Sequence, residues 1–364
     1  MRQVILIIII VELFMFGCNT KQEHIKIEVK NGITYVHNSK LPLSDIQLEP
    51  ELIIDEGEKE EEFFAQISDL IEDKDGKIYI VDRQNHEIKV FSYEGDYLQT
   101  IGSEGKGPGE FREPLNIGFI KDSKIIISDT QNRRFQLFDK RGNFIKSYKM
   151  EVDSPGFFQI DSNKRIYNKS FFFNFGNDET ENPLFNIYDI EFNKVAELGK
   201  EEKYNQPFET YVMNNCSFTI DSKDKVYVNY NVKNKILVFE NNILIKEIDR
   251  ELFFAPQKPS FKSENKNGTI SLSAYYEPIS YDIDIDSRDN IYVLTVYDNK
   301  EKEDITELEN YWSIILEVFD NEGQLIYIIP IKGISPAKIH IGSDDKIYLV
   351  DSNEMKVIRY RAIF

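Results

Sequence analysis

One short pattern recurs six times along this chain and constrains its fold more than any other feature. Each copy has a strand, a polar turn and then a second strand of the type Ile-Tyr-Val, which ends at Asp or Asn in most copies. These second strands begin at residues 78, 125, 166, 226, 291 and 347, so successive copies are 47, 41, 60, 65 and 56 residues apart. Propeller blades have about 40 to 50 residues and accept insertions, whereas solenoid repeats are shorter and more regular. The spacing therefore predicts six blades.

Two further strands follow in the first five units, which makes the predicted blade a four-stranded antiparallel sheet. The third strand ends in an apolar residue and Phe before a turn with Gly or Asn, as at 88–95. Gly and Asn accept the positive φ that hairpin turns need. A fourth strand follows, as at 97–101. Because one small sheet cannot bury both faces alone, we expect the sheets to pack face to face around an axis.

The sixth unit lacks a fourth strand, because the sequence ends at Phe364 directly after the third strand at 356–360. Residues 52–57, Leu-Ile-Ile-Asp-Glu-Gly, read like the end of the first blade, Leu-Gln-Thr-Ile-Gly at 98–102. We therefore expect residues 46–54 to complete the sixth blade and so to remove two open sheet edges. The predicted fold class is all-β, a six-bladed β-propeller of four-stranded antiparallel blades closed by an N-terminal strand.

Composition agrees with an all-β chain and excludes one class of partner. The 364 residues are 41% hydrophobic and 13% aromatic, and Ile, Phe, Tyr and Val favour sheets. The formal net charge of -19 would repel a phosphate backbone, so nucleic acid is not an expected partner. The acidity has two explanations, the solubility of a sheet-rich protein and the attraction of cations or basic partners.

The N-terminus predicts export and lipidation. An apolar run at 4–11 is too short to span a bilayer comfortably and is typical of a signal-peptide core. Residues 15–18, Met-Phe-Gly-Cys, resemble a lipobox, in which a small residue precedes the cysteine that receives the lipid. An ordinary signal peptide and an uncleaved anchor are the alternatives. The expected segments are a signal peptide at 1–17, a polar tether at 18–45 that begins at the lipidated Cys18, and the propeller at 46–364.

The second cysteine and the histidines do not indicate a catalytic or metal centre. If Cys18 carries a lipid, Cys216 has no intramolecular partner, and its place at the start of an alternating segment predicts an inert buried thiol. His86 occupies a turn of the repeat, where we expect a structural contact. Zinc needs three or four N or S ligands, and the isolated His37 and His340 do not supply them in one place.

Five of the six second strands end at Asp or Asn. These residues are Asp82, Asp129, Asn168, Asn229 and Asp351. A ring of their oxygens near the axis could hold a hard cation such as calcium. Alternatively, each side chain caps the turn that follows, because Asp and Asn bond nearby backbone donors. Repetition in nearly every blade is what the capping role predicts.

The insertions are concentrated at one end of the predicted propeller. The loops after the second strands of blades three and five, at 171–181 and 297–312, combine aromatic residues with carboxylates, and the crossing at 250–278 adds more. Such groups can hold a sugar or a peptide, but they could instead pack the insertions onto the blades. The candidate ligand-binding residues are Asp82, Arg83, Asp129, Arg133, Asn168, Asn229, Tyr297, Trp312 and Asp351.

Blade one resembles a known repeat. Residues 78–91, Ile-Tyr-Ile-Val-Asp-Arg-Gln-Asn-His-Glu-Ile-Lys-Val-Phe, followed by the glycine-rich 101–111, look like an NHL repeat, while blades three to five keep only the strand motif. The whole chain resembles the six-bladed, NHL-like propeller lipoproteins of Gram-negative bacteria, which implies a lipid anchor in the outer membrane. Enzymes also occur on such propellers, so the resemblance implies a fold without selecting an activity.

Two functions remain open from the sequence. The first is a non-enzymatic module without a cofactor, anchored in the cell envelope, that binds a carbohydrate, peptide or protein. The second is a lyase or hydrolase that uses a calcium ion held by the axial Asp and Asn residues. Convergence of Asp82, Asp129 and Asp351 on one point would favour the enzyme, whereas bonding to their own turns would favour the binding module.

Overall fold

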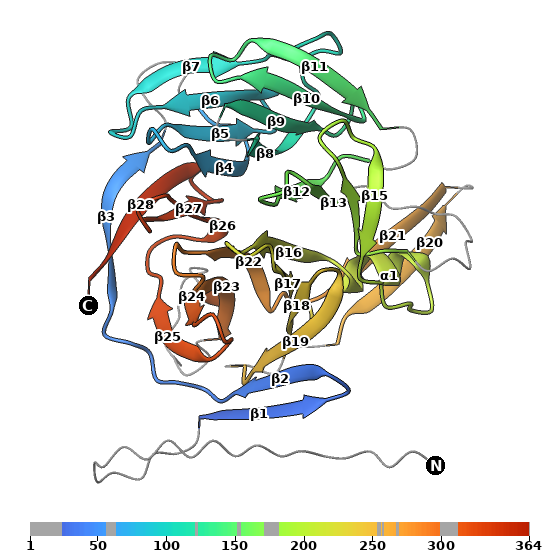
Figure 1. The fold of residues 1–364 in the computed structure, drawn as a ribbon, viewed down its shortest axis with the longest axis vertical. Coiled ribbons are helices and arrows are strands. Elements are labelled where there is room, and N and C mark those ends of the chain that lie inside the picture. The colour runs from blue at the N-terminus through green and yellow to red at the C-terminus, as the bar shows by residue number, and fades with distance from the viewer. Residues whose placement is uncertain are drawn as a thin grey trace.

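The structure is a computed structural model, and its six antiparallel sheets surround one axis (Figure 1), so the predicted six-bladed β-propeller is confirmed. The first strand of each blade is the innermost, because these strands contact one another around the ring. The residues that the structure describes are 24–55, 63–120, 123–150, 154–170, 182–252, 256, 258–266, 269–298 and 312–363.

Within each blade the strands follow one another from the innermost to the outermost. Blades one to three contain β4 (Ile67–Glu72), β5 (Ile78–Asp82), β6 (Glu87–Phe91) and β7 (Tyr97–Ile101); β8 (Pro114–Ile120), β9 (Lys124–Asp129), β10 (Arg134–Asp139) and β11 (Phe144–Lys149); and β12 (Phe157–Ile160), β13 (Ile166–Lys169), β14 (Phe185–Tyr188) and β15 (Lys194–Leu198). Blades four to six contain β16 (Cys216–Ile220), β17 (Val226–Tyr230), β18 (Ile236–Glu240) and β19 (Ile243–Arg250); β22 (Ser280–Ile285), β23 (Ile291–Asp298), β24 (Trp312–Phe319) and β25 (Leu325–Pro330); and β26 (Pro336–Ile341), β27 (Ile347–Asp351), β28 (Lys356–Ile363) and β3 (Gln47–Ile54).

The second strands explain the strongest part of the repeat. Strand β5 is buried along its whole length, as are β17 and β27. A strand covered on both faces needs a continuous apolar run rather than an alternation of apolar and polar residues. The Ile-Tyr-Val pattern therefore marks the strand that lies inside each blade, between two partner strands and two neighbouring blades.

The ring closes as the sequence predicts. Strand β3 pairs antiparallel with β28, from Ile54 opposite Val357 to Gln47 opposite Ile363. Ile54 is buried with Val357 in the core between blades six and one. The N-terminal strand thus supplies the outermost strand of the last blade, and the two ends of the propeller domain are held in one sheet.

The polar tether expected at 18–45 is wrong for a large part of its length. Strands β1 (Ile25–Lys30) and β2 (Ile33–Asn38) form a hairpin, and β2 pairs parallel with β19, so the sheet of blade four has six strands. Val36 is buried in the core between blades four and five, which gives the hairpin a hydrophobic reason to dock. The propeller body therefore includes residues well before position 46, whereas Cys18 and the signal peptide lie outside the described residues.

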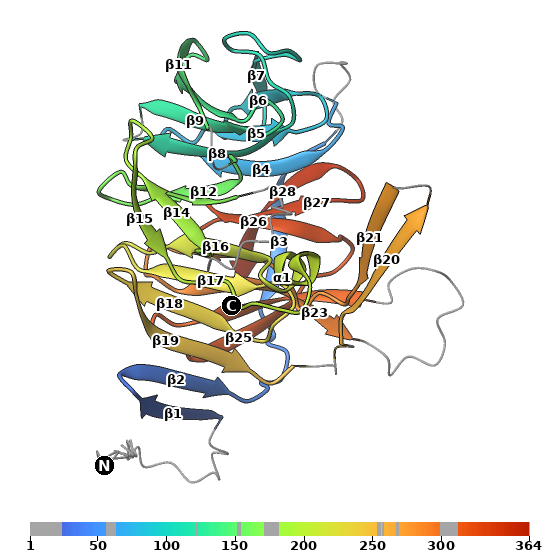
Figure 2. The same ribbon diagram turned by 90° about the vertical axis from the view of Figure 1, so that its right-hand side faces the viewer.

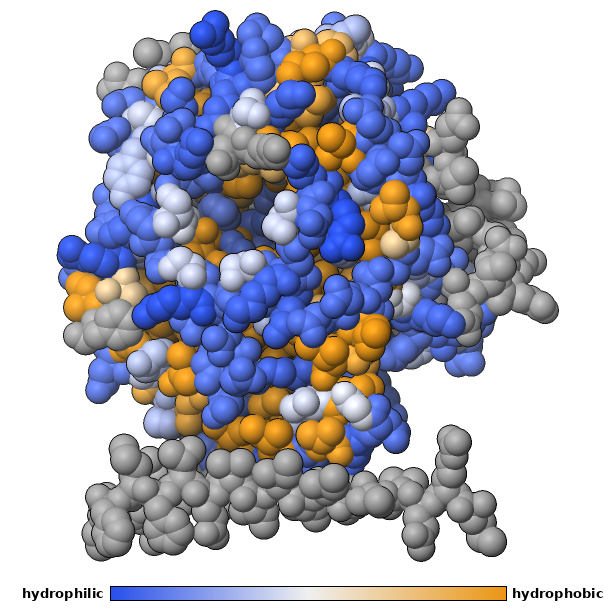
Figure 3. All heavy atoms as spheres, viewed as in Figure 1, coloured by the Kyte–Doolittle hydropathy of each residue, from blue (hydrophilic) through white to orange (hydrophobic). Residues whose placement is uncertain are grey.

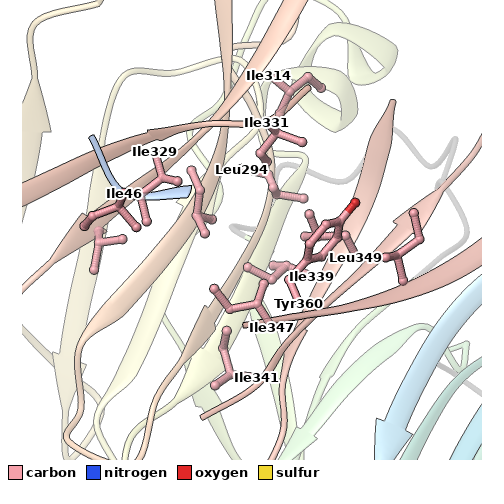
Figure 4. Close-up of a cluster of buried hydrophobic side chains, with 13 residues drawn as sticks. Ile46, Leu294, Ile314, Ile329, Ile331, Ile339, Ile341, Ile347, Leu349 and Tyr360 are labelled. Atoms are coloured by element: carbon pink, nitrogen blue, oxygen red, sulfur yellow. The ribbon is translucent and has the colours of Figure 1, made fainter. Parts of the chain in front are cut away.

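The hydrophobic core is divided into six clusters, one at each interface between neighbouring blades. Figure 4 shows the cluster between blades five and six, where Leu294 and Ile329 meet Ile339 and Leu349. Ile46, just before β3, is buried in the same cluster. Each blade thus buries its two faces against its two neighbours, which is the packing that a ring of small sheets requires.

The Ser-x-Asp sequences within the repeated turns join neighbouring blades at one end of the ring, which we call the turn end. The serine of one blade donates its backbone N–H and its hydroxyl to the aspartate of the next. The pairs are Ser162 with Asp224, Ser222 with Asp289 and Ser287 with Asp345, with N–H to oxygen distances of 2.8, 3.0 and 2.8 Å. These aspartates have φ values of 60 to 63°, a conformation in which Asp is enriched. The pattern therefore specifies contacts between blades as well as turns.

Substitution of Ile54 tests the closure. Ile54 is 4% exposed and its neighbour Ile53, on the opposite face of β3, is 50% exposed. We expect Ile54→Ala to lower the free energy of unfolding by about 2–4 kcal/mol, because it leaves a cavity in the core. Ile53→Ala, the matched control, should change it by less than about 1 kcal/mol. Urea unfolding followed by circular dichroism measures both, and equal effects would contradict the packing of β3 in blade six.

Candidate functional site

The innermost strands face the axis with an open edge, and side chains of neighbouring blades satisfy their backbone donors. In each case a backbone N–H of one blade donates to a side chain of the preceding blade at 2.7 to 3.2 Å. The donor and acceptor residues are Ile117 and Asp69, Phe158 and Asn116, Ile339 and Asp282, Ile341 and Asp284, and Glu72 and His340. We call these acceptors the axial girdle. They connect blades one, two and three, and blades five, six and one.

Lys338 occupies the centre of the girdle. Its Nζ lies 3.2 Å from Oδ1 of Asp69 in blade one and 3.4 Å from Oδ2 of Asp282 in blade five. The same ammonium lies 5.5 Å from the ring centroid of Phe157 in blade three, on the far side of the ring from blade six. An atom that contacts three other blades must lie near the axis. The side chain is 21% exposed, so solvent still reaches it.

Burial and charge act against each other in this group. Burial raises the pKa of Asp282 to about 6, although the nearby Lys338 opposes the change. Burial would lower the pKa of Lys338, but the carboxylates of Asp282 and Asp69 outweigh it and hold the pKa above its usual value. The charged ammonium therefore depends on its two carboxylate neighbours, and they depend on it.

His340 is engaged on both ring nitrogens. Its Nε2 accepts the backbone N–H of Glu72 at 3.2 Å, and Nδ1 lies 3.2 Å from Oδ2 of Asp284. A nitrogen that accepts an N–H carries no proton, so the neutral ring has its proton on Nδ1 and donates it to Asp284. His340 thus positions strands at the axis and does not offer a free base in this arrangement.

The Asp and Asn residues at the ends of the second strands are buried, and Asp82, Asp129, Asn168 and Asp351 accept backbone N–H groups. Asp82 accepts the N–H groups of Ala65 and Gln66 at 2.9 and 3.0 Å, from the crossing that enters its own blade. It also accepts the N–H of Asn85 in the following turn at 3.2 Å. The corresponding contacts elsewhere are Arg112 N–H to Asp129 at 2.8 Å, Gly156 N–H to Asn168 at 2.9 Å, and Ser335 and Asn353 N–H to Asp351 at 3.4 and 3.1 Å.

Asp82 and Asp351 accept an N–H of the turn that follows, as the capping interpretation predicts, whereas the backbone donors of Asp129 and Asn168 lie in the crossing that enters their own blade. Asn229 differs in detail, because it accepts the hydroxyl of Ser280 from blade five at 3.0 Å. Among the described residues, no group of three or more His, Cys, Asp or Glu side chains is placed to hold a metal ion. The observation that would have favoured the calcium enzyme, a convergence of Asp82, Asp129 and Asp351, is therefore not found in this part of the chain.

Blade five, which has Thr295 in place of Asp or Asn, uses a buried ion pair. Thr295 Oγ1 donates to Oε2 of Glu317 at 2.5 Å, and Arg250 Nε lies 2.6 Å from the same oxygen. Burial raises the pKa of Glu317, and Arg250 opposes this effect. Arg250 ends β19 of blade four, so the pair joins blades four and five, which Asn229 and Ser280 also connect. Sequence reasoning missed it, although the break in the Asp/Asn pattern was its signal.

Arg83 and Arg133, the two arginines among the predicted ligand-binding residues, lie in different surroundings. Arg83 Nη2 lies 2.6 Å from Oε2 of Glu113 in the crossing to blade two, and this pairing lowers the pKa of Glu113. His86 Nδ1 accepts the backbone N–H of Glu113 at 3.0 Å, which confirms its structural contact. Arg133 is exposed in the turn before β10, with a φ of 51°. Cys216 begins β16 and is buried as predicted, and burial raises the pKa of its thiol.

The end opposite the turn end, which we call the crossing end, carries added elements on blades four and five (Figure 2). These are helix α1 (Pro207–Met213), the hairpin of β20 (Ser260–Lys266) and β21 (Thr269–Tyr275), and the extended ends of β23 and β24. The rings of Phe208 and Phe261 meet edge to face at 6.2 Å, so α1 and the hairpin are in contact. We call the three elements together the raised rim.

No helix in the described residues is long and apolar enough to cross a membrane.

Two of the predicted ligand-binding residues, Tyr297 and Trp312, lie on neighbouring strands of the raised rim at adjacent positions of the ladder. Tyr297 pairs with Ser313 and Asp298 pairs with Trp312, so both aromatic residues lie at the outer end of the β23–β24 ladder. These strands have eight residues each, whereas β5 and β6 have five. The insertions at 171–181 and 299–311 lie outside the described residues. Trp312 starts its strand, which was the alternative role expected for it from the sequence.

Two tyrosines at the crossing end, Tyr204 before α1 and Tyr275 on the raised rim, differ in their surroundings. Tyr204 donates to Glu202 at 3.0 Å and lies 5.5 Å from the ammonium of Lys233, so it helps to fix the crossing before α1. Tyr275, at the end of β21, is 64% exposed. Tyr275 is therefore an exposed aromatic side chain on the raised rim.

The turn end has hollows of a different kind. Figure 3 shows this end, with polar side chains around a hollow near the centre of the ring. A separate groove of about 580 Å³ between blades five and six is lined by residues such as Arg288, Tyr292 and Arg361. Other charged groups of the groove already have partners, since Lys346 pairs with Glu51 at 2.8 Å. The turn end is therefore stabilised largely by its own contacts.

The fold and the site define a class of protein, a closed β-propeller whose axis is lined by an ion-paired girdle and whose added elements lie at one end. Residues 58–304 match the DUF5128 family, described as a 6-bladed beta-propeller, and the chain belongs to this family. A comparison with curated proteins found no matching sequence.

Two solved structures from Bacteroides share the fold. A member of the DUF4221 family from Bacteroides vulgatus has a TM-score of 0.60 and 13% identity, with 87% of this chain and 98% of the other covered. A candidate exported protein from Bacteroides fragilis has a TM-score of 0.60 and 12% identity, with 91% and 100% covered. At these identities the similarity shows the fold alone.

The girdle predicts an unusual pH dependence for Lys338→Met. Loss of the ammonium leaves Asp69 and Asp282 buried without their cation, so we expect the free energy of unfolding at pH 7 to fall by about 3 kcal/mol. The pKa of Asp282, already raised by burial, then rises further, and the folded state binds more protons than the unfolded state. Stability of this variant should therefore increase as the pH falls from 7 to 5, measured by urea unfolding.

The exposed pair of Lys146 and Glu191 provides the control. Lys146→Met should cost less than about 1 kcal/mol and show no gain at lower pH relative to the unmodified protein. If Lys338→Met were as mild as this control at pH 7, the proposed dependence of the axis on Lys338 would be wrong.

Proposed function

We propose that this protein is a non-enzymatic binding module, anchored by a lipid in the cell envelope, that holds a carbohydrate or polypeptide ligand at the raised rim. The observation that carries the proposal is the difference between the two ends of the ring. Short turns tied to the neighbouring blade form much of the turn end. The helix, the hairpin and the extended strands all lie at the crossing end.

Added elements on a rigid ring are typical of ligand binding. Loops and insertions commonly carry binding residues because the scaffold holds them in place. An isolated two-stranded hairpin such as β20–β21 is marginally stable, so its contact with α1 through Phe208 and Phe261 supports its position. The hairpin presents Tyr275 to solvent beside that contact. An exposed aromatic ring with polar neighbours gives contact area to a sugar ring or a peptide.

The axis supports a binding role better than a catalytic one. The buried Asp and Asn oxygens bond to backbone donors, and His340 is engaged on both nitrogens. A general base or a nucleophile needs a free site within reach of a substrate. Within the described residues the axial groups serve the contacts between blades, which leaves the raised rim as the better candidate surface.

Two observations support the envelope location. The apolar run at 4–11 and the lipobox-like residues 15–18 predict export and a lipid on Cys18. A structural relative from Bacteroides fragilis is described as a candidate exported protein. Several acyl chains together would give stable anchoring, whereas one chain alone binds a membrane only marginally.

Binding at the raised rim is tested with the unlipidated protein, residues 19–364, on arrays of polysaccharides and peptides. For a ligand detected in this way, Tyr275→Ala should weaken binding at least about tenfold, because it removes an exposed aromatic contact. Tyr327→Ala is the matched control, since Tyr327 is another exposed tyrosine but lies on β25 outside the raised rim. A ligand that loses affinity with Tyr327→Ala and not with Tyr275→Ala would place binding elsewhere.

Lipidation is tested in cells with labelled palmitate. We expect the full-length protein to incorporate label and to fractionate with membranes. Cys18→Ser should remove the label and release the protein, because the acceptor thiol is lost. Cys216→Ser is the control and should keep the label, since Cys216 is buried in the propeller. Label retained in Cys18→Ser would contradict the proposed anchor.

A further inference from the structure

The N-terminal hairpin is a rigid part of blade four. Strand β2 pairs with β19 from Thr34 opposite Lys246 to Asn38 opposite Arg250. Asn38 is buried, donates to the carbonyl of Gly323 at 3.0 Å and accepts the N–H of Leu325 at 2.9 Å. The hairpin is therefore fixed to blades four and five, and β1 forms the outermost edge of the ring.

The exposed surface of β1 differs from the protein as a whole. Strand β1 contains two lysines and one glutamate, a formal charge of +1, whereas the whole chain carries -19. Lys26 and Lys30 have side chains that are 72% and 52% exposed, although both pair with Glu28. Ile27 and Val29, between these lysines, are also exposed. Because successive side chains of a strand point to opposite faces, β1 carries its lysines on one face and Ile27 and Val29 on the other. This strand edge therefore offers both basic and apolar groups, which suit the headgroup region of an anionic bilayer.

The anchor would bring this edge close to lipid. Cys18 and Ile25 are seven residues apart, and an extended chain covers at most about 3.5 Å per residue, or about 25 Å in all. Five inter-strand spacings of about 4.8 Å place β1 about 24 Å outside the innermost strand of blade four. Cys18 therefore lies no more than about 25 Å from the start of β1. Blade four, to which β1 belongs, is the blade nearest to the lipid attachment.

We propose that β1 is a membrane-contacting edge, which lies on an anionic phospholipid surface with the propeller axis roughly parallel to the bilayer. The inference depends on the lipid anchor of the proposed function. In this orientation the raised rim and the turn end both open sideways, so neither is covered by lipid. A ligand can then reach the rim while the protein stays attached.

The orientation is tested by chemical attachment, which does not require cellular lipidation. The protein from residue 18 onward, with Cys216→Ser, is coupled through Cys18 to maleimide lipid in vesicles of phosphatidylethanolamine and phosphatidylglycerol. Lysine acetylation read by mass spectrometry compares coupled with free protein. We expect the reactivity of Lys26 and Lys30 to fall at least about fivefold on the vesicles, because they lie at the lipid surface.

Lys146 is the matched control, because its side chain is also 52% exposed, it also pairs with a glutamate, and it lies on blade two. Its reactivity should not change. Equal protection of Lys146, or unchanged reactivity of Lys26 and Lys30, would overturn the proposed orientation. Palmitate labelling that fails on Cys18 would overturn the anchor instead, so the two outcomes are distinguishable. Vesicles of phosphatidylcholine alone should protect Lys26 and Lys30 less, since they lack the anionic charge.

Discussion

The satisfaction of open inner strand edges by neighbouring blades is the interaction on which this ring depends. A first strand has a paired edge on one side and unpaired N–H groups toward the axis, which are costly without partners. In this ring Asp69, Asn116, Asp282, Asp284 and His340 accept those donors across blade boundaries. Closure by β3, the apolar clusters and the Ser-Asp contacts hold the blades at the spacing that these short bonds require. The blades are therefore mutually dependent.

Local patterns predicted the features that are encoded locally. The continuous apolar run at 78–81 identifies a buried second strand, and the turn residues after it set the hairpins. Repetition then gave the number of blades, and the missing fourth strand of the last unit pointed to residues 46–54. Capping of the following turn by Asp82 and Asp351 could also be predicted, because Asp and Asn bond backbone donors a few residues away, but their bonds to the crossing that enters the blade could not.

Features that depend on contacts between residues far apart in the sequence could not be predicted from it. The hairpin of β1 and β2 looked like a polar tether, since its docking depends on Val36 meeting residues more than 200 positions away. The Arg250–Glu317 pair and the contact of Lys338 with Asp69 and Asp282 have the same character. Charged residues in a first strand look like surface residues in sequence, and only the closed ring shows that they face one another.

The contact between Lys338 and Phe157 has a consequence for how the ring is held together. These side chains come from opposite blades and meet across the centre of the ring, with the ammonium 5.5 Å from the aromatic centroid. The same ammonium also pairs with Asp69 of blade one and Asp282 of blade five. One side chain of blade six is thus in contact with three other blades, so the ring is braced across its middle as well as around its circumference.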